Sequence, residues 1–388
     1  MKKKIIILGS TGSVGTNTLK IINKDKKRFN VFVLSAHKNI DKLLVQAKKF
    51  NCKNLIVTHQ KYFRKLKKKT LNSNINIFDN FDSLKSLLKK NKIFYSMISM
   101  SGLDALKPSI ILSKFSQNLA IVNKESLISA WHLINSSIKK NKVNFIPIDS
   151  EHYCIFNLLK NHTTKDIEKL YITASGGPFL NYSKKMYKTI TPKIALVHPN
   201  WRMGKKISID SSTMMNKVFE VIEAHNIFNI DYDKISILIH PSSYIHAIIK
   251  FKNGLIKIIA HEPDMKIPIH NSLYENKEYK FKTKSLDLKT LNHLNLNPVD
   301  INKFPVVKIL KNLPKNNSLY ETALITTNDY LVEKFLKNEI SFSKLNNLII
   351  KLSSLKTFTK FKALKPDKID KIYSLRKFVS MKINSLGI

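Results

Sequence analysis

A set of polar side chains with helical spacing is the first part of this sequence that could do chemistry. The set follows a loop, residues 198–206, that carries two ring side chains and three cations in HPNWRMGKK. On a wheel of about 100° per residue, six polar residues share an arc of roughly 140°. They are Ser212, Thr213, Asn216, Lys217, Glu220 and Glu223. An amphipathic surface helix would give the same arc. Short hydroxyls, an amide, one cation and two carboxylates are more typical of a binding site than the lysine-rich surface expected elsewhere.

Two more carboxylates, Asp149 and Glu151, follow an apolar segment, 143–148, that we expect to be a strand. Side chains two residues apart on an extended chain point to one side, so a third carboxylate would complete a site for a divalent cation. The same residues fit a structural role, with Ser150 capping a helix that begins near Tyr153 and Glu151 in its first turn. The residues alone leave both interpretations open.

A glycine-rich turn follows the first apolar run, Lys4–Leu8, and helical spacing resumes from Asn17 to Asn23. Strand, glycine turn and helix in this order are typical of a dinucleotide site, because glycine lets backbone N–H groups approach a pyrophosphate at a helix N-terminus. The predicted contacts are Gly9, Thr11, Gly12, Ser13, Val14 and Gly15.

The next predicted strand, Phe29–Ser35, indicates which nucleotide is bound. It ends in Ala36, His37, Lys38 and Asn39, with no carboxylate to bind a ribose 2′-hydroxyl. Lys38 can meet a 2′-phosphate, which favours NADP, although one exposed lysine among many would look the same. Further strands are expected at 54–58, 93–98 and 119–122, with helical segments between them, so we predict a parallel doubly wound sheet. Its strand ends would bring Ser99, Met100 and Ser101 near the cofactor, with Asn123, Lys124 and Glu125 at the next strand end.

The remaining chain predicts a mixed region and then helices. A strand at 171–174 leads into Ser175 and two glycines, a turn suited either to a phosphate or to a simple corner. Strands are expected at 234–239, 247–252 and 255–261, the last two joined at Asn253-Gly254 as a hairpin. We interpret Glu262 and Asp264 after that hairpin as structural.

We therefore expect an α/β protein with three domains. Residues 1–148 would form a Rossmann-type parallel sheet domain, 149–275 a central α+β catalytic domain, and 306–388 a C-terminal helical bundle, with a polar linker at 276–305.

The net charge of +40 over 388 residues suggests an anionic partner. The lysines are spread along the whole chain without an arginine cluster or zinc spacing, so we expect no specific nucleic acid partner, and an anionic small substrate fits as well. Two cysteines without a pairing pattern favour a reducing compartment. The apolar run near the start is too short for a signal peptide and no run is long enough for a membrane span, so we expect a cytoplasmic protein.

Several blocks of this sequence together resemble the 1-deoxy-D-xylulose 5-phosphate reductoisomerase family. They are GSTGSVG at Gly9, VNKESL at Val122, PIDSEH at Pro147, TASGGPF at Thr173, HPNWRMGKKISIDSSTMMNK at His198, IHPSSYIHA at Ile239 and EPDMKIPI at Glu262. In the family's order they cover nearly all of the first 270 residues. The helical tail agrees only in kind.

The resemblance implies a homodimeric enzyme that uses NADPH and Mg²⁺ or Mn²⁺, with Co²⁺ as a further candidate. It would isomerise and reduce 1-deoxyxylulose 5-phosphate to 2-C-methylerythritol 4-phosphate in the non-mevalonate route to isoprenoids. Asp149, Glu151 and Glu220 would hold the metal, and Lys124 would be a further catalytic residue. The implied substrate contacts are Lys124, Ser150, Glu151, Ser175, His198, Trp201, Ser211, Asn216, Lys217 and Glu220. Residues near 198–205 would form a flap in which Gly204 meets the cofactor, and the central domain would hold the dimerisation strands.

Three residues depart from the family pattern: Arg202 stands where a small polar residue is usual, and His37 and His261 stand where glycine is common. None replaces an implied metal ligand or phosphate contact. One alternative is a metal-independent NADP-dependent dehydrogenase of another sugar phosphate, against which the three carboxylates count. Another is a basic scaffold or nucleic acid binder with a dinucleotide fold, which steep salt-dependent nucleic acid binding would favour.

Overall fold

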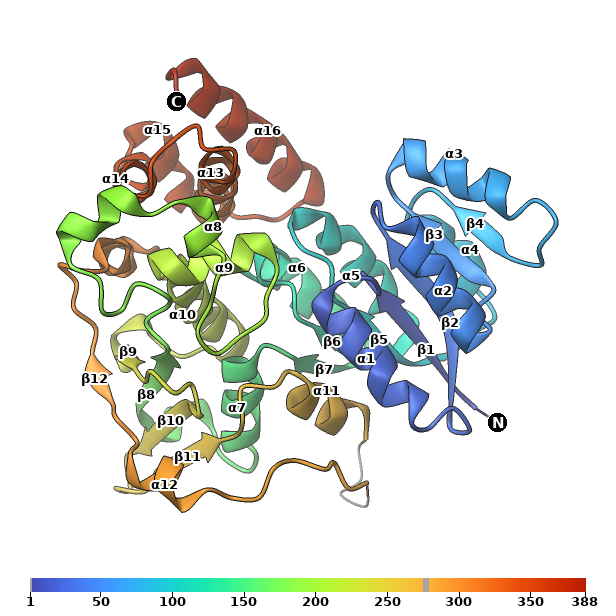
Figure 1. Ribbon diagram of the computed structural model, residues 1–388, viewed down its shortest axis with the longest axis horizontal. Helices are drawn as coiled ribbons and strands as arrows, with labels where there is room; N and C mark the ends of the chain where they lie inside the picture. Colours follow the sequence, from blue (N-terminus) through green and yellow to red (C-terminus); the bar gives the residue numbers. More distant parts are fainter. Residues whose placement is uncertain (1, 275–278) are drawn as a thin grey trace. The chain divides into compact units, whose positions relative to one another are not determined.

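The computed structural model describes residues 2–274 and 279–388, and the chain folds into two compact units (Figure 1). The first unit comprises Met1–Ser126, Leu133–Asp149 and Met265–Lys282, and the second comprises Leu127–His132, Ser150–Asp264 and Thr283–Ile388. The predicted domain boundaries after residues 148 and 305 stay a prediction, and the one between 275 and 276 lies outside the described residues.

The first unit is built on a parallel sheet, as predicted. Its strands are β1 (Lys3–Leu8), β2 (Phe29–Ala36), β3 (Asn54–Val57), β4 (Asn76–Phe78), β5 (Ile93–Ile98), β6 (Ser116–Ile121) and β7 (Asn144–Pro147). Their order in the sheet is β4-β3-β2-β1-β5-β6-β7, with every neighbouring pair parallel. Ile5 to Leu8 are completely buried. Continuous apolar runs of this kind are required in a parallel sheet that helices cover on both faces.

Helices connect these strands. They are α1 (Ser13–Asn23), α2 (Ile40–Phe50), α3 (Gln60–Lys69), α4 (Ser83–Leu88), α5 (Leu106–Leu112) and α6 (Lys124–Asn141), and α11 (Lys266–Leu273) packs against α1. Two side-chain caps match the strand ends that the sequence singled out. Asn39 accepts a hydrogen bond from the Lys42 N–H, and Asn123 accepts one from the Ser126 N–H. The ends of β2 and β6 therefore pass directly into capped helices.

The second unit contains a mixed sheet of β8 (Ile167–Ala174), β9 (Ile235–Ile239), β10 (Ile245–Phe251), β11 (Ile256–Ala260) and β12 (Asn297–Pro298). The order is β11-β10-β8-β9-β12, in which β8 and β9 are parallel and the other pairs are antiparallel. Gly254 adopts φ +87° between β10 and β11, which confirms the predicted hairpin at Asn253-Gly254. The helices α7 (Ser150–Leu158), α8 (Pro192–Ala195), α9 (Lys205–Thr213), α10 (Met215–Phe228) and α12 (Leu288–Asn292) complete this region.

The C-terminal segment is helical, as predicted. It contains α13 (Leu319–Leu336), α14 (Phe342–Ser353), α15 (Lys356–Thr359) and α16 (Ile369–Ser385). Short 3₁₀ turns lie at Leu103–Ala105, Thr164–Asp166, Lys184–Thr189, Tyr232–Lys234, Pro305–Asn312 and Lys360–Ala363. Helix α13 begins with a capping box, in which Ser318 and Glu321 satisfy each other's backbone N–H groups.

The single helix predicted up to Glu223 is wrong. Met214 has φ +67° and separates α9 from α10, so Ser212 and Thr213 lie on the first helix and Asn216 to Glu223 on the second. A left-handed residue ends one helix and turns the chain into the next. The polar side chains of the arc are buried, which rules out the alternative of a surface helix: Ser212, Lys217, Glu220 and Glu223 are all at most 5% exposed.

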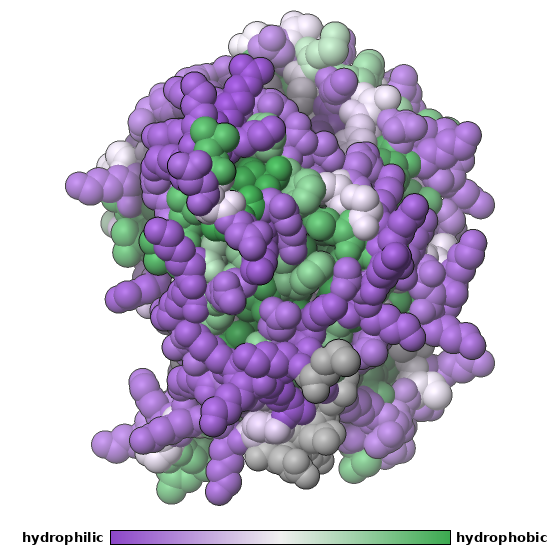
Figure 2. All heavy atoms as spheres, turned by 90° about the vertical axis from the view of Figure 1, so that its right-hand side faces the viewer, coloured by the Kyte–Doolittle hydropathy of each residue, from purple (hydrophilic) through white to green (hydrophobic). Residues whose placement is uncertain are grey.

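The surface and the helices agree with the composition. Hydrophilic side chains cover most of the face shown in Figure 2, as a lysine-rich chain requires. Within the described residues, no helix combines the length and the apolar character needed to cross a membrane.

Candidate active site

The glycine turn of the first unit has the geometry of a nucleotide site. Gly9 adopts φ +81°, and a Cβ there would lie 2.6 Å from the Ser99 carbonyl oxygen. A Cβ on Gly15 would lie 2.5 Å from the Gly9 carbonyl oxygen, so the turn and the start of α1 can pack only with glycine at these places. Gly12 precedes α1 without a side-chain cap. The first N–H groups of α1 are thus left for a ligand, and this position favours a phosphate.

The neighbouring strand end presents two histidines and a lysine. The Nδ1 atom of His37 lies 2.9 Å from the Thr58 hydroxyl, and the rings of His37 and His59 meet edge to face at 5.2 Å. Burial, followed by the positive charge of His59, lowers the pKa of His37. Lys38 is exposed. The sequence missed Lys42, whose ammonium donates to the Thr11 carbonyl at 2.8 Å and steadies the turn from α2.

Asn123 connects the end of β6 to the loop after β5. Its side-chain amide donates to the carbonyls of Met100 and Gly102, both at 3.0 Å, and to Glu125 at 2.9 Å. Lys124, the next residue, is only 7% exposed and forms an ion pair with Asp149. Capping therefore fixes the direction in which Lys124 leaves the sheet.

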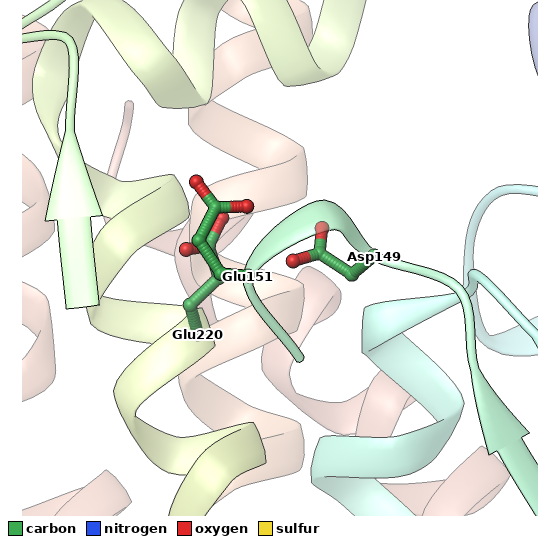
Figure 3. A group of neighbouring side chains, drawn as sticks. All are labelled: Asp149, Glu151 and Glu220. Carbon is green, nitrogen blue, oxygen red and sulfur yellow. The ribbon is translucent and has the colours of Figure 1, made fainter. Parts of the chain in front are cut away.

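Three carboxylates gather as Figure 3 shows: Asp149 from the loop after β7, Glu151 from the first turn of α7, and Glu220 from α10. One oxygen of each lies within 4.8 Å of the others. Asp149 ends the first unit and is bonded directly to Ser150, the first residue of α7, so the predicted cap at Ser150 is one residue too late. Hard oxygen donors at this spacing fit Mg²⁺ or Mn²⁺.

A buried lysine neutralises two of these carboxylates. The Lys217 ammonium lies 2.8 Å from Glu151 and 2.5 Å from Glu220. Burial lowers the pKa of Lys217, but the two carboxylates outweigh this effect, so the pKa is raised and the lysine stays protonated. Asn216 donates to Glu220 at 2.6 Å, and the Ser150 hydroxyl donates to Glu151 at 2.5 Å. The family resemblance implied that Asn216 and Lys217 bind the substrate, whereas their contacts here are with the carboxylates.

His198 links the loop before α9 to the glycine turn after β8. Its Nδ1 atom accepts from the backbone N–H groups of Asn200 and Trp201, both at 3.1 Å. That nitrogen must be unprotonated, so Nε2 carries the hydrogen and donates to the Ser175 hydroxyl oxygen at 3.1 Å. The Gly177 N–H also donates to this oxygen, at 3.0 Å. With its lone pairs so occupied, the Ser175 hydroxyl hydrogen is free to donate to an anion.

The glycine pair after Ser175 lies against the end of α9. Gly176 and Gly177 adopt φ +84° and +68°, and a Cβ on Gly177 would lie 2.9 Å from the Ser211 carbonyl oxygen. This close approach places Ser175 and Ser211 in the same neighbourhood. Gly204 immediately precedes α9 in the second unit, and a Cβ there would meet nothing within 4 Å.

A buried pair, His152 and Glu223, lies behind the carboxylates; the sequence placed Glu223 in the polar arc without a role of its own and missed His152. His152 is completely buried, its Nε2 atom lies 2.9 Å from the Glu220 carbonyl oxygen, and its Nδ1 atom lies 3.6 Å from Glu223. His152 stood in the PIDSEH block and Glu223 in the polar arc, but spacing alone could not show that they meet across α7 and α10. Their contacts fix the backbone from which Glu220 projects.

A second support holds α9 to the C-terminal helices. Asn328 of α13 donates to Asp210 at 2.7 Å, and Lys206 bridges Asp210 and Asp329 at 2.9 and 3.1 Å. No motif in the tail pointed to this network, because its two halves are more than 100 positions apart.

Comparison with known proteins agrees with this geometry. Family models match residues 5–131 (1-deoxy-D-xylulose 5-phosphate reductoisomerase), 145–228 (the C-terminal domain of the same enzyme) and 261–380 (DXP reductoisomerase C-terminal domain).

Among curated relatives, the 1-deoxy-D-xylulose 5-phosphate reductoisomerase of Pelagibacter ubique is 51% identical over 387 residues, covering 100% of both chains. The enzyme of the same name from Clostridium kluyveri is 37% identical, covering 89% of this chain and 91% of its own length.

Solved structures of full length are also similar. A DOX-P reductoisomerase in complex with NADPH, fosmidomycin and magnesium has a TM-score of 0.91 at 30% identity, covering 99% of this chain and 98% of its own. The Zymomonas mobilis 1-deoxy-D-xylulose 5-phosphate reductoisomerase in complex with NADPH has a TM-score of 0.88 at 29% identity, covering 100% and 99%. With family models, relatives and structures in agreement along its length, this chain belongs to the 1-deoxy-D-xylulose 5-phosphate reductoisomerase family.

Proposed function

We propose that this chain isomerises and reduces 1-deoxy-D-xylulose 5-phosphate to 2-C-methyl-D-erythritol 4-phosphate, using NADPH and a divalent metal ion, in the non-mevalonate route to isoprenoids. The observation that carries the proposal is the carboxylate cluster, since Asp149, Glu151 and Glu220 lie within 4.8 Å of one another beside buried Lys217 in a chain that also holds a nucleotide turn. A plain dehydrogenase does not need such a cluster.

Asp149, Glu151 and Glu220 would hold Mg²⁺ or Mn²⁺, and Co²⁺ would suit the same oxygens. Bound there, the ion supplies Lewis acidity toward the carbonyl and neighbouring hydroxyl of a ketose. His152 and Glu223 act behind Glu220, because they fix its backbone from completely buried positions.

Two buried lysines set the charge around the substrate. Lys124 contacts Asp149, and Lys217 contacts Glu151 and Glu220. Because Lys217 stays protonated, it can neutralise an incoming anion as well as the carboxylates. We assign Lys124 to the reacting end of the sugar and Lys217, with Asn216, to the region near its phosphate, with Ser150 binding the sugar between them.

Ser175, His198 and Ser211 would complete the phosphate site. The hydroxyl hydrogen of Ser175 is left to donate, as its oxygen already accepts two hydrogen bonds. Trp201 follows His198 on the half-buried loop before α9, and we propose that this loop closes over the substrate and excludes water.

NADPH would bind at the glycine turn of the first unit, where it supplies the hydride. Backbone N–H groups at the start of α1 would meet its pyrophosphate, and Lys38 would meet the 2′-phosphate. The remaining contacts are assigned to Thr11, Ser13, Val14, Ala36, His37, Asn39, Asn123, Glu125 and Gly204.

We further propose a cytoplasmic homodimer. Strand β11 lies at the edge of its sheet and exposes Ile256 by 59% and Ile258 by 50%, which is the kind of edge that proteins cover with a partner. Cys52 and Cys154 are buried and form no disulfide, as a reducing compartment allows. Light scattering of the purified chain would test the dimer.

The direct test is NADPH oxidation with 1-deoxy-D-xylulose 5-phosphate, with and without Mg²⁺. We expect turnover with Mg²⁺, loss of turnover after EDTA treatment, and recovery when Mg²⁺ or Mn²⁺ is restored. Full turnover in EDTA would refute the metal assignment and favour a metal-independent dehydrogenase. No turnover of this substrate under any condition would refute the proposed reaction.

A further inference from the structure

Three ring side chains of the second unit form a continuous contact, and two of them, His246 and His261, have no role in the proposed reaction. The rings of His246 on β10 and His261 after β11 stack with centroids 3.8 Å apart and planes at 24°. The ring of Trp201 meets His246 edge to face at 6.1 Å. His246 is 1% exposed. The stack thus joins the end of a hairpin to the loop before α9.

The register of the hairpin creates this contact. Ile245 pairs with Ala260 and Ala247 with Ile259, with an irregularity between them at His246. A bulge of this kind re-aims the side chain at the irregular position. His246 and His261 therefore stack side by side at the open end of the β10–β11 pair.

The hydrogen bonds of both rings fix their tautomers. His246 donates from Nε2 to the His261 carbonyl at 3.2 Å, and His261 donates from Nδ1 to the Glu262 carbonyl at 2.6 Å. Burial in the first place, and then His261, lowers the pKa of His246 to about 3, and burial is also the main cause that lowers the pKa of His261. Both rings are therefore neutral near pH 7, and the stack depends on shape rather than on charge.

The Nε2 atom of His261 is buried without a hydrogen-bond partner among the described residues. Burying an unsatisfied acceptor costs free energy. The unpaired Nε2 atom therefore does not stabilise His261 at this position. The stabilising contact of its ring is the flat face that it presents to His246.

Among the described residues, the loop that carries Trp201 makes side-chain hydrogen bonds near its start. The Trp201 N–H donates to His198, and the Asn200 amide donates to the Pro241 carbonyl at 2.6 Å and to the Ser243 hydroxyl at 2.9 Å. Arg202 and Gly204, which follow, are exposed. The only ring against the indole within the described residues is that of His246.

We propose that His261 is a positioning residue for this loop: its ring supports His246, which in turn orients Trp201 over the substrate site. The inference rests on the proposed function, since it assumes that the loop closes on the substrate. It assigns His261 no contact with substrate, metal or cofactor.

The test uses Trp201 as its own probe, in a Trp131→Phe background where it is the sole tryptophan. The variants are His261→Ala, which removes the ring; His261→Phe, which keeps a flat ring; and His261→Leu, which fills space without one. The matched control is His162→Ala, which removes a ring that lies tilted against Phe251 of the same sheet, 4.4 Å between centroids.

We expect His261→Ala to raise the acrylamide quenching constant of Trp201 about twofold and the KM for the sugar phosphate about fivefold, in line with the loss of one aromatic pair. The KM for NADPH should not change. His261→Phe should restore both values, and His261→Leu should not. If His261→Ala fails to fold, the proposal is decided by comparing Trp201 quenching and the KM for the sugar phosphate between His261→Phe and His261→Leu.

Quenching in His261→Ala equal to that in His162→Ala would overturn the proposal, as would equal rescue by Phe and Leu. The quenching experiment needs no substrate. Absence of turnover in every variant and in the parent chain would therefore count against the proposed function, while quenching would still decide whether the stack positions Trp201.

Discussion

The protonation state of His198 shows how single residues prepare the phosphate site. Two backbone N–H groups hold Nδ1 as an acceptor, so Nε2 must donate to Ser175. Burial, assisted by the positive charge of Lys217, lowers the pKa of His198 to about 4. The arrangement is therefore constant above that pH. Between pH 6.5 and 4 the folded chain binds fewer protons here than the unfolded chain, so His198 makes stability fall as the pH is lowered through this range.

Substitutions of His198 can separate the acceptor role of Nδ1 from the donor role of Nε2. His198→Asn keeps an acceptor near the Nδ1 position but loses the donor to Ser175, whereas His198→Gln keeps a donor and loses the acceptor. We expect the Asn variant to raise the KM for the sugar phosphate about tenfold, the scale of one lost hydrogen bond to a charged group, and to leave Trp201 quenching unchanged. The Gln variant should instead change Trp201 quenching and leave the KM for the sugar phosphate unchanged. Steady-state kinetics and quenching check this, and identical behaviour of the two variants would contradict the tautomer.

Lys38 carries the proposed choice of NADPH over NADH. Removing its charge as Lys38→Ala should weaken NADPH binding about tenfold and leave NADH binding unchanged, because only NADPH has a 2′-phosphate. Titration by nucleotide fluorescence measures both constants. Lys20→Ala, which removes another exposed lysine from α1, is the control. Equal weakening of NADPH and NADH binding would show that Lys38 does not act through the 2′-phosphate.

At the scale of elements, the cap of α13 contains a second perturbed group. Glu321 is completely buried, and burial raises its pKa to about 7 although Ser318 hydrogen-bonds to it. Between pH 4.5 and 7 the folded chain keeps a proton that the unfolded chain releases. Stability is therefore fully present below pH 4.5 and falls as the pH rises, by about 3 kcal/mol in total.

Glu321→Gln should remove this dependence while it keeps an oxygen for the cap. The stability of the variant relative to the parent is expected to rise by about 3 kcal/mol between pH 4.5 and 8, measured by urea unfolding. Glu333→Gln, which removes an exposed carboxylate from the same helix, serves as control. If the stabilities of the parent and of Glu321→Gln changed with pH in parallel, the raised pKa would not belong to Glu321.

The elements also show what the sequence could predict. Apolar runs bounded by glycine or polar residues predicted the parallel sheet and the hairpin, because burial on both faces or a required positive φ leaves a direct mark on residue type. The break at Met214 left no such mark, since methionine is not a residue that favours φ +67°. Helical spacing continued across it, and the predicted polar arc joined two separate helices.

The sequence offered Asp149 and Glu151 as candidates for a cation site, but their spacing alone left a capping role equally open. The contacts within the site were not predictable. The pairing of Lys217 with two carboxylates and the support of Glu220 by His152 depend on the packing of α7 with α10, which no local pattern encodes. Resemblance supplied Glu220 as the third ligand; spacing in the sequence could not.

At the scale of the whole molecule, two of the lysines behind the net charge of +40 differ from the rest in their surroundings. Lys124 and Lys217 are buried against carboxylates, whereas most other lysines are exposed. A uniformly basic surface raises the local concentration of anionic sugar phosphates and nucleotides. The substrate KM should therefore increase with ionic strength.

We propose that the first unit holds the nucleotide while the second contributes Glu220 to the metal site. The most direct measurement compares NADPH binding and Mg²⁺-dependent turnover in one preparation of Glu220→Gln, with the exposed Glu168→Gln as control. We expect turnover to fall at least about 100-fold, since even residues behind metal ligands are worth 10–100-fold, while the affinity for NADPH stays within about twofold of the parent. Loss of NADPH binding together with turnover, or full turnover without Glu220, would contradict the account.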